Sequence, residues 1–194
     1  MSDQRTDDLI IIFDTTLRDG GQTRGVDFSA ADKQFIAQAL DDFGIDYIEG
    51  GWPGANPTDD MFFSKDQKLN NAKLVAFGMT RRGGRSVEND PGLNAILNAK
   101  TDATCLVGKT WDFHVTTALN IELDENLRMI TESVAAAKAR GHESMFDCEH
   151  YFDGYKANPD YALSCVQAAH QGGASWVILL SLIHISEPTR LSVI

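Results

Sequence analysis

Short apolar runs alternate with amphipathic stretches along nearly the whole chain, and this alternation limits the folds open to it. Successive runs begin roughly 30 to 40 residues apart, which leaves room for one helix between each pair of strands. A helical crossover brings each strand back in the same direction, so the pattern predicts a parallel sheet. The runs that predict buried strands cover residues 9–13, 47–51, 74–78, 103–108, 144–148 and 176–180.

The stretches between these runs carry helix signals at their ends. Ser29 and Asp32 have the spacing of a capping pair, an apolar stripe follows them, and Gly44 stands where such a helix ends. The longest helix is predicted over 124–140. Another is predicted to begin at Pro159, because proline suits the first helical position. Weaker helical patterns cover 58–69 and 91–100.

A (β/α)8 barrel and a doubly wound sheet both fit this rhythm, and two features favour the barrel. No Gly-x-Gly-x-x-Gly fingerprint follows the first strand, and polar residues recur at the carboxyl end of nearly every strand. Only about six strands are predicted, whereas a closed barrel of this type has eight. We therefore expect a truncated TIM (β/α)8 barrel with about the first five to six βα units, formed by residues 1–180.

The last residues break the pattern. Residues 181–194 show neither helical nor strand periodicity, and 180–190 resembles the translation of a sequencing-library adapter. We expect residues 181–194 to be a non-native tail, with a genuine divergent terminus as the alternative. His184 lies in this tail, so we give it no functional role.

The net charge and the cysteine content indicate which binding partners and which cellular compartment to expect. The 194 residues carry a formal net charge of -11, which argues against a nucleic-acid partner because phosphate binding needs a basic face. The three cysteines lack Cys-x-x-Cys spacing, so structural thiols in a reducing compartment are expected. No apolar run approaches membrane-spanning length, and the polar start does not resemble a signal peptide. We expect a cytoplasmic protein that binds neither membrane nor nucleic acid.

A cluster of polar side chains follows the first predicted strand and includes Arg18 beside Asp19. The carboxylate of Asp19 can supply an oxygen ligand to a divalent metal. The guanidinium of Arg18 can neutralise negative charge that develops on a bound substrate. The pattern therefore suits a metal-bound anionic substrate, and an ordinary turn with a surface ion pair is the alternative interpretation.

These residues carry a resemblance to a known family. Residues 14–20 (Asp-Thr-Thr-Leu-Arg-Asp-Gly) resemble the family of isopropylmalate, homocitrate and citramalate synthases, and segments 48–57, 108–115 and 148–156 most resemble its citramalate branch. The resemblance covers about residues 9–179. It implies a pyruvate carboxyltransferase-like barrel that condenses acetyl-CoA with a 2-keto acid, pyruvate in the citramalate branch, and then hydrolyses the thioester. It also implies a divalent metal cation (Mg²⁺, Mn²⁺ or Zn²⁺), a homodimeric parent protein and a product that feeds isoleucine synthesis.

The same resemblance implies roles for three residues, and Gln22 and Thr80 are further candidates for binding the substrate together with Arg18. Asp19 matches the metal-binding aspartate of the family, and Arg18 matches the arginine that polarises the keto acid and stabilises the oxyanion. Glu149 matches the catalytic glutamate. Gln22 is expected to position the Arg18–Asp19 pair by hydrogen bonding, with a plain turn residue as the alternative. Thr80 is expected to contact the substrate, with a helix cap as the alternative.

Other polar residues near the strand ends have weaker interpretations. Glu49 is expected to form a structural ion pair with Arg18 or Arg81. The basic run 81–85 either attracts the phosphates of coenzyme A or forms a solvated loop. His150, next to the predicted catalytic glutamate, is either a structural or exposed group or a functional one.

The chain also departs from the family pattern. Members of the family complete the metal site with a His-x-His pair on a later strand, and the five histidines of this chain are isolated. Because a single carboxylate holds a divalent ion weakly, we expect this chain as written neither to bind metal tightly nor to turn over. Isopropylmalate or homocitrate synthesis and a related carbon–carbon lyase are alternatives within the enzyme class. The alternative outside it is a non-catalytic barrel fragment that needs a partner chain.

Overall fold

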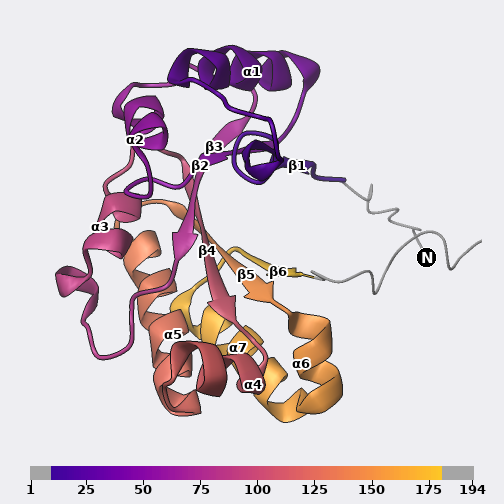
Figure 1. Cartoon of the computed structure of the whole chain (residues 1–194), viewed down its shortest axis with the longest axis vertical. Helices are drawn as coiled ribbons and strands as arrows, with labels where there is room; N and C mark the ends of the chain where they lie inside the picture. Colours follow the sequence, from indigo (N-terminus) through magenta and orange to yellow (C-terminus); the bar gives the residue numbers. More distant parts are fainter. Residues whose placement is uncertain (1–9, 181–194) are drawn as a thin grey trace, which may run out of the picture.

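A six-stranded parallel sheet forms the centre of the computed structural model, which describes residues 10–180 (Figure 1). Neighbouring strands in the sheet are also neighbours in the sequence, in the order β1 to β6. A doubly wound sheet would reverse its strand order, so the prediction of a partial barrel is confirmed. The strands are β1 (Phe13–Asp14), β2 (Tyr47–Gly51), β3 (Lys73–Met79), β4 (Ala103–Lys109), β5 (Glu143–Glu149) and β6 (Trp176–Leu179). The predicted tail, residues 181–194 with His184, lies outside the described residues.

Helices connect the strands and cover the outer face of the sheet (Figure 1). The longest, α5, packs against β4 and β5 and also against α7. Among residues 10–180, no helix combines the length and apolar character needed to cross a membrane. The helices are α1 (Ala30–Phe43), α2 (Pro57–Ser64), α3 (Pro91–Leu97), α4 (Asp112–His114), α5 (Leu123–Ala139), α6 (Tyr151–Ala157) and α7 (Pro159–Gly172). Short turns of other helix types are η1 (Gly20–Gln22), η2 (Val87–Asn89) and the π-helical η3 (Val115–Leu119).

The capping signals of the sequence place most helix ends. Ser29 and Asp32 form a complete capping box at the start of α1, and Gly44 ends that helix in the left-handed conformation with φ 92°. Pro159 occupies the first turn of α7, as predicted. The weaker patterns were too long at their carboxyl ends. The helix predicted over 58–69 ends at Ser64, because the backbone becomes extended at Lys65. The helix predicted over 91–100 ends at Leu97.

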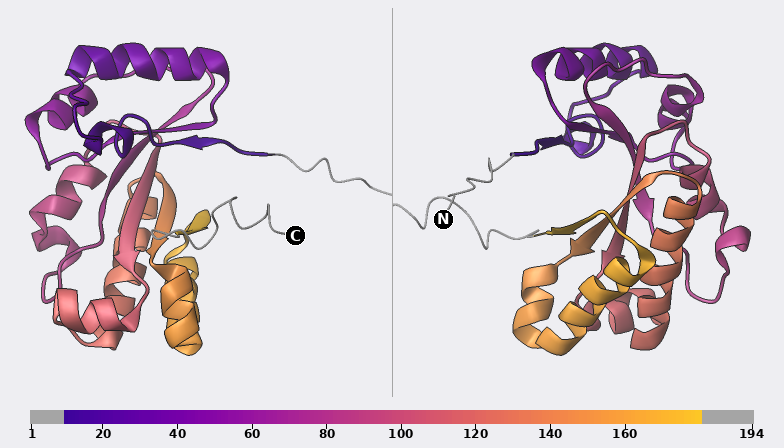
Figure 2. Two further views of the ribbon diagram at one scale, coloured as in Figure 1. Left: turned by 45° about the vertical axis from the view of Figure 1, so that its right-hand side comes forward. Right: turned by 180° about the vertical axis from the view of Figure 1, so that it is seen from behind.

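Apolar side chains pack on both faces of the sheet. The larger cluster lies between the sheet and the helices and includes Phe146 and Ile130, both fully buried. A smaller cluster on the inner face includes Val75 and Met145, at most 1% exposed. These inner side chains are buried because the curved strands cover one another's side chains. On β6, which forms one edge of the sheet (Figure 2), Trp176 is by contrast 42% exposed.

Gly154 lets α6 lie directly on the turn that follows β4. A Cβ atom at this position would stand 2.5 Å from the carbonyl oxygen of Thr110 and 2.9 Å from the Cα of Trp111. Both neighbours are backbone atoms, which cannot rotate away. We expect Gly154→Ala to lower the free energy of unfolding by about 1 to 3 kcal/mol, measured by urea denaturation. Gly20→Ala is the matched control, since its Cβ would meet nothing closer than 3.7 Å; equal effects of the two substitutions would contradict the prediction.

Candidate active site

The loop after β1 turns sharply at the carboxyl end of the sheet. The backbone N–H groups of Arg18, Asp19 and Gly20 all donate to the carbonyl oxygen of Thr15, over 3.2, 2.9 and 3.1 Å. Leu17 is buried beside them at 1% exposure and anchors the turn in the apolar core. The turn thereby fixes the backbone from which Arg18 and Asp19 extend.

Arg18 makes three contacts through its guanidinium group. Its Nε donates to Glu49 Oε2 over 2.6 Å, and Nη1 lies 3.2 Å from Asp19 Oδ1. The guanidinium carbon also lies 4.0 Å from the centre of the Phe77 ring, a cation–π contact. Of the two partners predicted for Glu49, the structure selects Arg18. The guanidinium is held in one orientation at the mouth of the sheet, with Asp19 beside it and 62% exposed.

Beneath Arg18 lies a buried acidic cluster that the sequence analysis did not identify. It consists of Glu49, Cys105 and Asp147, from β2, β4 and β5, whose ligand atoms lie within 4.8 Å of one another. Burial raises the pKa of Glu49 to about 7, although Arg18 opposes the shift. Burial likewise raises the pKa of Asp147 to about 6 and that of the Cys105 thiol well above its usual value. The second oxygen of Glu49, Oε1, is buried without a hydrogen-bond partner.

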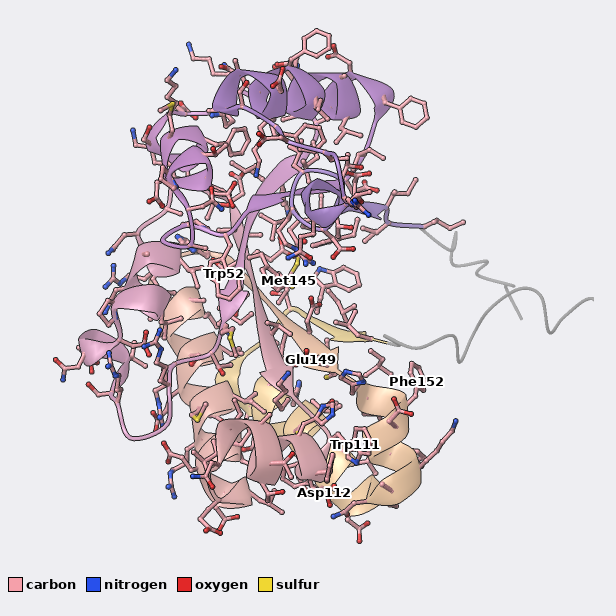
Figure 3. The ribbon with its side chains drawn as sticks, viewed as in Figure 1. Trp52, Trp111, Asp112, Met145, Glu149 and Phe152 are labelled. Carbon is pink, nitrogen blue, oxygen red and sulfur yellow. The ribbon has the colours of Figure 1, made fainter. Side chains whose placement is uncertain are left out.

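Glu149 ends β5 on the same inner face as Asp147, two residues further toward the mouth (Figure 3). Its Oε2 lies 2.5 Å from the Nζ of Lys109, which is its direct neighbour in the register between β4 and β5. The carboxylate is 21% exposed and the lysine side chain 19%. The predicted catalytic glutamate is thus part of an ion pair that opens toward solvent.

Of the three predicted substrate-binding residues, Arg18 and Gln22 line one cavity and Thr80 lines another. Gln22 and Arg18 line a polar cavity of about 400 Å³ between the loops that follow β1 and β2. Thr80 is 6% exposed and lines a more apolar cavity of about 380 Å³, together with Lys109. Trp52 lines both cavities and separates them. Gln22 therefore shares a cavity with Arg18, whereas Thr80 shares the other cavity with Lys109.

One residue of the basic run that follows β3, Arg81, has a structural role. Arg81 is 4% exposed, and its guanidinium pairs with Glu125 at 2.7 Å and Glu132 at 2.6 Å on α5. The hydrogen bond from Arg81 lowers the pKa of Glu125 to about 2. The predictions that Arg81 belongs to a solvated loop or pairs with Glu49 are therefore wrong. Arg81 instead attaches the β3 end to the helix layer.

A group of aromatic side chains surrounds the end of β5. His150 follows Glu149 in the left-handed conformation with φ 56°, which is uncommon for a residue with a side chain. Its ring meets that of His114 edge-on, with 4.6 Å between the ring centres, and the ring of Trp111 lies 4.6 Å from that of His114. Burial, together with the nearby His150 and Lys109, lowers the pKa of His114. His150 is therefore packed in this group next to the site and is not an isolated surface residue.

The residues at the mouth fit only part of a divalent-metal site. Asp19 offers a largely exposed carboxylate, and carboxylate oxygens suit Mg²⁺, Mn²⁺ or Zn²⁺. Within residues 10–180, the only three His, Cys, Asp or Glu side chains grouped closely enough to share an ion are those of the buried acidic cluster, and Asp19 is not among them. Asp19 can therefore be one ligand of a cation whose other ligands lie outside the described residues.

Comparison with known proteins gives the fold and the function a family context. The chain is 55% identical to the (R)-citramalate synthase of Aquifex aeolicus over 88% of its length and 49% identical to that of Streptomyces coelicolor over 89%. It covers 33% of either relative, so it spans about a third of the length of these curated proteins. More distant relatives include 2-isopropylmalate synthases. The HMG-CoA lyase of Bacillus subtilis shares the fold, with a TM-score of 0.70 and 16% identity over 95% of this chain and 62% of that one. The family model described as HMGL-like matches residues 9–192, and the chain therefore belongs to the HMGL-like family.

Proposed function

We propose that this chain is part of a cytoplasmic acyltransferase that condenses acetyl-CoA with pyruvate to form citramalate. The observation that carries the proposal is the presence of Arg18, Asp19 and Glu149 at one end of the sheet, in a chain 55% identical to an (R)-citramalate synthase. The three free, buried cysteines suit a reducing compartment. Isopropylmalate and homocitrate synthesis use the same chemistry with a larger keto acid, and they are the alternatives.

The condensation forms a bond between the methyl carbon of the acetyl thioester and the keto carbon of pyruvate. Glu149 takes the proton that leaves the methyl group, which requires an ionised carboxylate at the mouth. Arg18 donates hydrogen bonds to the oxygen of the keto group, on which negative charge grows as the new bond forms. Hydrolysis of the thioester then releases coenzyme A. A divalent cation held in part by Asp19 would add polarisation of the keto group when bound.

The pockets support roles for the other two predicted residues. Gln22 lines the polar cavity with Arg18, from which its amide can hydrogen-bond the acceptor. Thr80 and Lys109 line the neighbouring, more apolar cavity, which suits the long pantetheine arm of acetyl-CoA better than a small, charged keto acid. We assign the acceptor to the Gln22 side of Trp52 and the thioester to the Thr80 side.

A chimera tests the proposal. Residues 10–179 replace the corresponding segment of the Aquifex aeolicus enzyme, which supplies the remaining two thirds of the protein. We expect release of coenzyme A from acetyl-CoA with pyruvate, followed with a thiol reagent, and loss of this activity after chelation of divalent metal. The Aquifex aeolicus protein without the segment is the control. Preference for a branched or dicarboxylic keto acid would favour one of the alternative syntheses, and a folded chimera without turnover on any of them would contradict the proposal.

The exposed strand edge favours a second candidate, a barrel fragment that another chain completes. β1 and β6 are the two edge strands of the open sheet (Figure 2). Ile12 before β1 is 48% exposed and Leu179 in β6 is 43% exposed, so apolar residues stand at both edges. Coexpression of the 194-residue chain with the remaining two thirds of the Aquifex aeolicus enzyme tests this candidate. Copurification of the two pieces with activity would support it.

A further inference from the structure

Two lysine–glutamate ion pairs cross the inner face of the sheet, one at each end. Lys73 on β3 lies 2.6 Å from Glu143 at the start of β5, at the amino end of the strands. Lys109 lies 2.5 Å from Glu149 at the carboxyl end of β5. The pairs have the same chemistry, and only the second lies at the end where the proposed reaction takes place. The two glutamates are equally exposed at 21%, whereas Lys73 is 52% exposed and Lys109 19%, so the pairs can be compared by position and by burial of the lysine.

The backbone around Lys109 and Glu149 is fixed from several sides. The N–H and the hydroxyl of Thr110 both donate to the carbonyl oxygen of Glu149, over 3.2 and 2.7 Å. The side-chain amide of Asn126, which is fully buried, donates to the carbonyl oxygen of Lys109 over 2.9 Å. Both main chains are therefore held in register, and the ion pair between the side chains sets where the carboxylate of Glu149 points.

Glu149 differs from the other two inner carboxyl groups, Glu49 and Asp147, in the charged groups around it. Glu49 and Asp147 depend on a single guanidinium, that of Arg18, and burial raises the pKa of each toward neutrality. Glu149 has the ammonium group of Lys109 to itself and is partly open to solvent. Of the three inner carboxyl groups, Glu149 is thus the one that combines a lysine partner of its own with access to solvent.

We propose that Lys109 is a positioning residue that holds the carboxylate of Glu149 in the orientation in which it faces the thioester. The proposal rests on the proposed function, in which Glu149 accepts the methyl proton. Lys109 also lines the cavity assigned to the thioester, so one residue contacts both the proposed base and that cavity. A displacement of about 1 Å at a reacting group can lower a rate on the order of a hundredfold, so loss of this contact should be visible in turnover.

The first test uses the 194-residue chain and needs no activity. The side-chain carboxyl carbon of Glu149 is assigned in a ¹³C NMR spectrum through Glu149→Gln. We expect Lys109→Met to shift this resonance clearly, Lys109→Arg to shift it less, and Lys73→Met to leave it in place. If Lys109→Met does not fold, the proposal is tested by comparing the shift of the Glu149 resonance in Lys109→Arg with its shift in Lys73→Met. A Glu149 resonance that responds no more to Lys109 than to Lys73 would overturn the proposal.

The second test measures kinetics in the chimera. We expect Lys109→Met to lower kcat about a hundredfold with the KM for pyruvate within about twofold, and Lys109→Arg to recover part of the loss. Lys73→Met should leave both constants near those of the parent chimera. Equal kinetics of the two methionine variants would overturn the positioning role. A parent chimera that never turns over would count against the proposed function, and the NMR result would then stand by itself for Lys109.

Discussion

Replacement of Arg18 by lysine is expected to lower the turnover of the chimera by at least about a hundredfold. Arginine uses Nε for Glu49 and Nη1 for Asp19 while its plane rests on Phe77. A lysine keeps the positive charge, and its single ammonium group cannot reach the same set of partners in a fixed plane. Loss of one donor to a developing oxyanion typically lowers kcat by about 10² to 10³. The measurement is kcat for release of coenzyme A with pyruvate at saturation.

Arg81→Lys is the matched control for this prediction. Arg81, like Arg18, lies between two carboxylates, and its partners Glu125 and Glu132 lie on α5, outside the sheet. Arg81 also lines the cavity assigned to the thioester, so kcat is compared at saturating acetyl-CoA. We expect this variant to lose stability in urea denaturation and to keep the kcat of its parent under that condition. If the two arginine variants lose turnover to the same extent, Arg18 acts through folding, and its proposed role at the keto oxygen is wrong.

Most strands could be predicted from the sequence because their residues are largely apolar. The first is the exception, since the predicted run 9–13 overlaps β1 (Phe13–Asp14) only at Phe13. Tyr47–Gly51 was predicted with both ends correct, since a glycine pair ends the run. β3 and β5 each extend one residue beyond their predicted limits at both ends. Three of the four added residues, Lys73, Glu143 and Glu149, are charged and form ion pairs on the inner face, so no apolar pattern could include them; the fourth is Met79. Hydrophobicity therefore located the strands, and cross-strand pairing set their ends.

The site could be predicted only where it is local in sequence. Arg18 and Asp19 follow one strand directly, so their neighbourhood is visible in the chain. Asp147 was read as part of an apolar strand, and it joins Glu49 only because the register of the curved sheet places them on one face. The partners of Arg81 lie 44 and 51 residues further along the chain, and no local pattern indicates them. Contacts of this kind depend on how helix and sheet pack, which sequence periodicity does not determine.

The buried acidic cluster is expected to make the protein less stable as the pH rises from about 4 to 7. Burial raises the pKa of Asp147 from 3.8 to about 6 and that of Glu49 from 4.5 to about 7. In this window the folded chain retains protons that the unfolded chain has lost, so the free energy of unfolding falls with increasing pH. The lowered pKa of His114 and of His142 acts in the opposite direction near neutral pH. A variant of the cluster and its parent contain the same two histidines. The difference between their free energies of unfolding therefore reports the contribution of the cluster alone.

Asp147→Asn is therefore expected to stabilise the chain relative to the parent as the pH is raised. A shift of about two pKa units corresponds to about 2 to 3 kcal/mol, gained between pH 4 and pH 7 and constant above it. The measurement is the difference in urea unfolding free energy between variant and parent across this range. Asp41→Asn is the control, because burial acts on Asp41 but backbone N–H donors from residues 70–72 outweigh it and lower its pKa. Its difference from the parent should stay flat between pH 5 and pH 7. A flat difference for Asp147→Asn as well would mean that Asp147 is ionised in the folded chain and that Arg18 neutralises both carboxylates of the cluster.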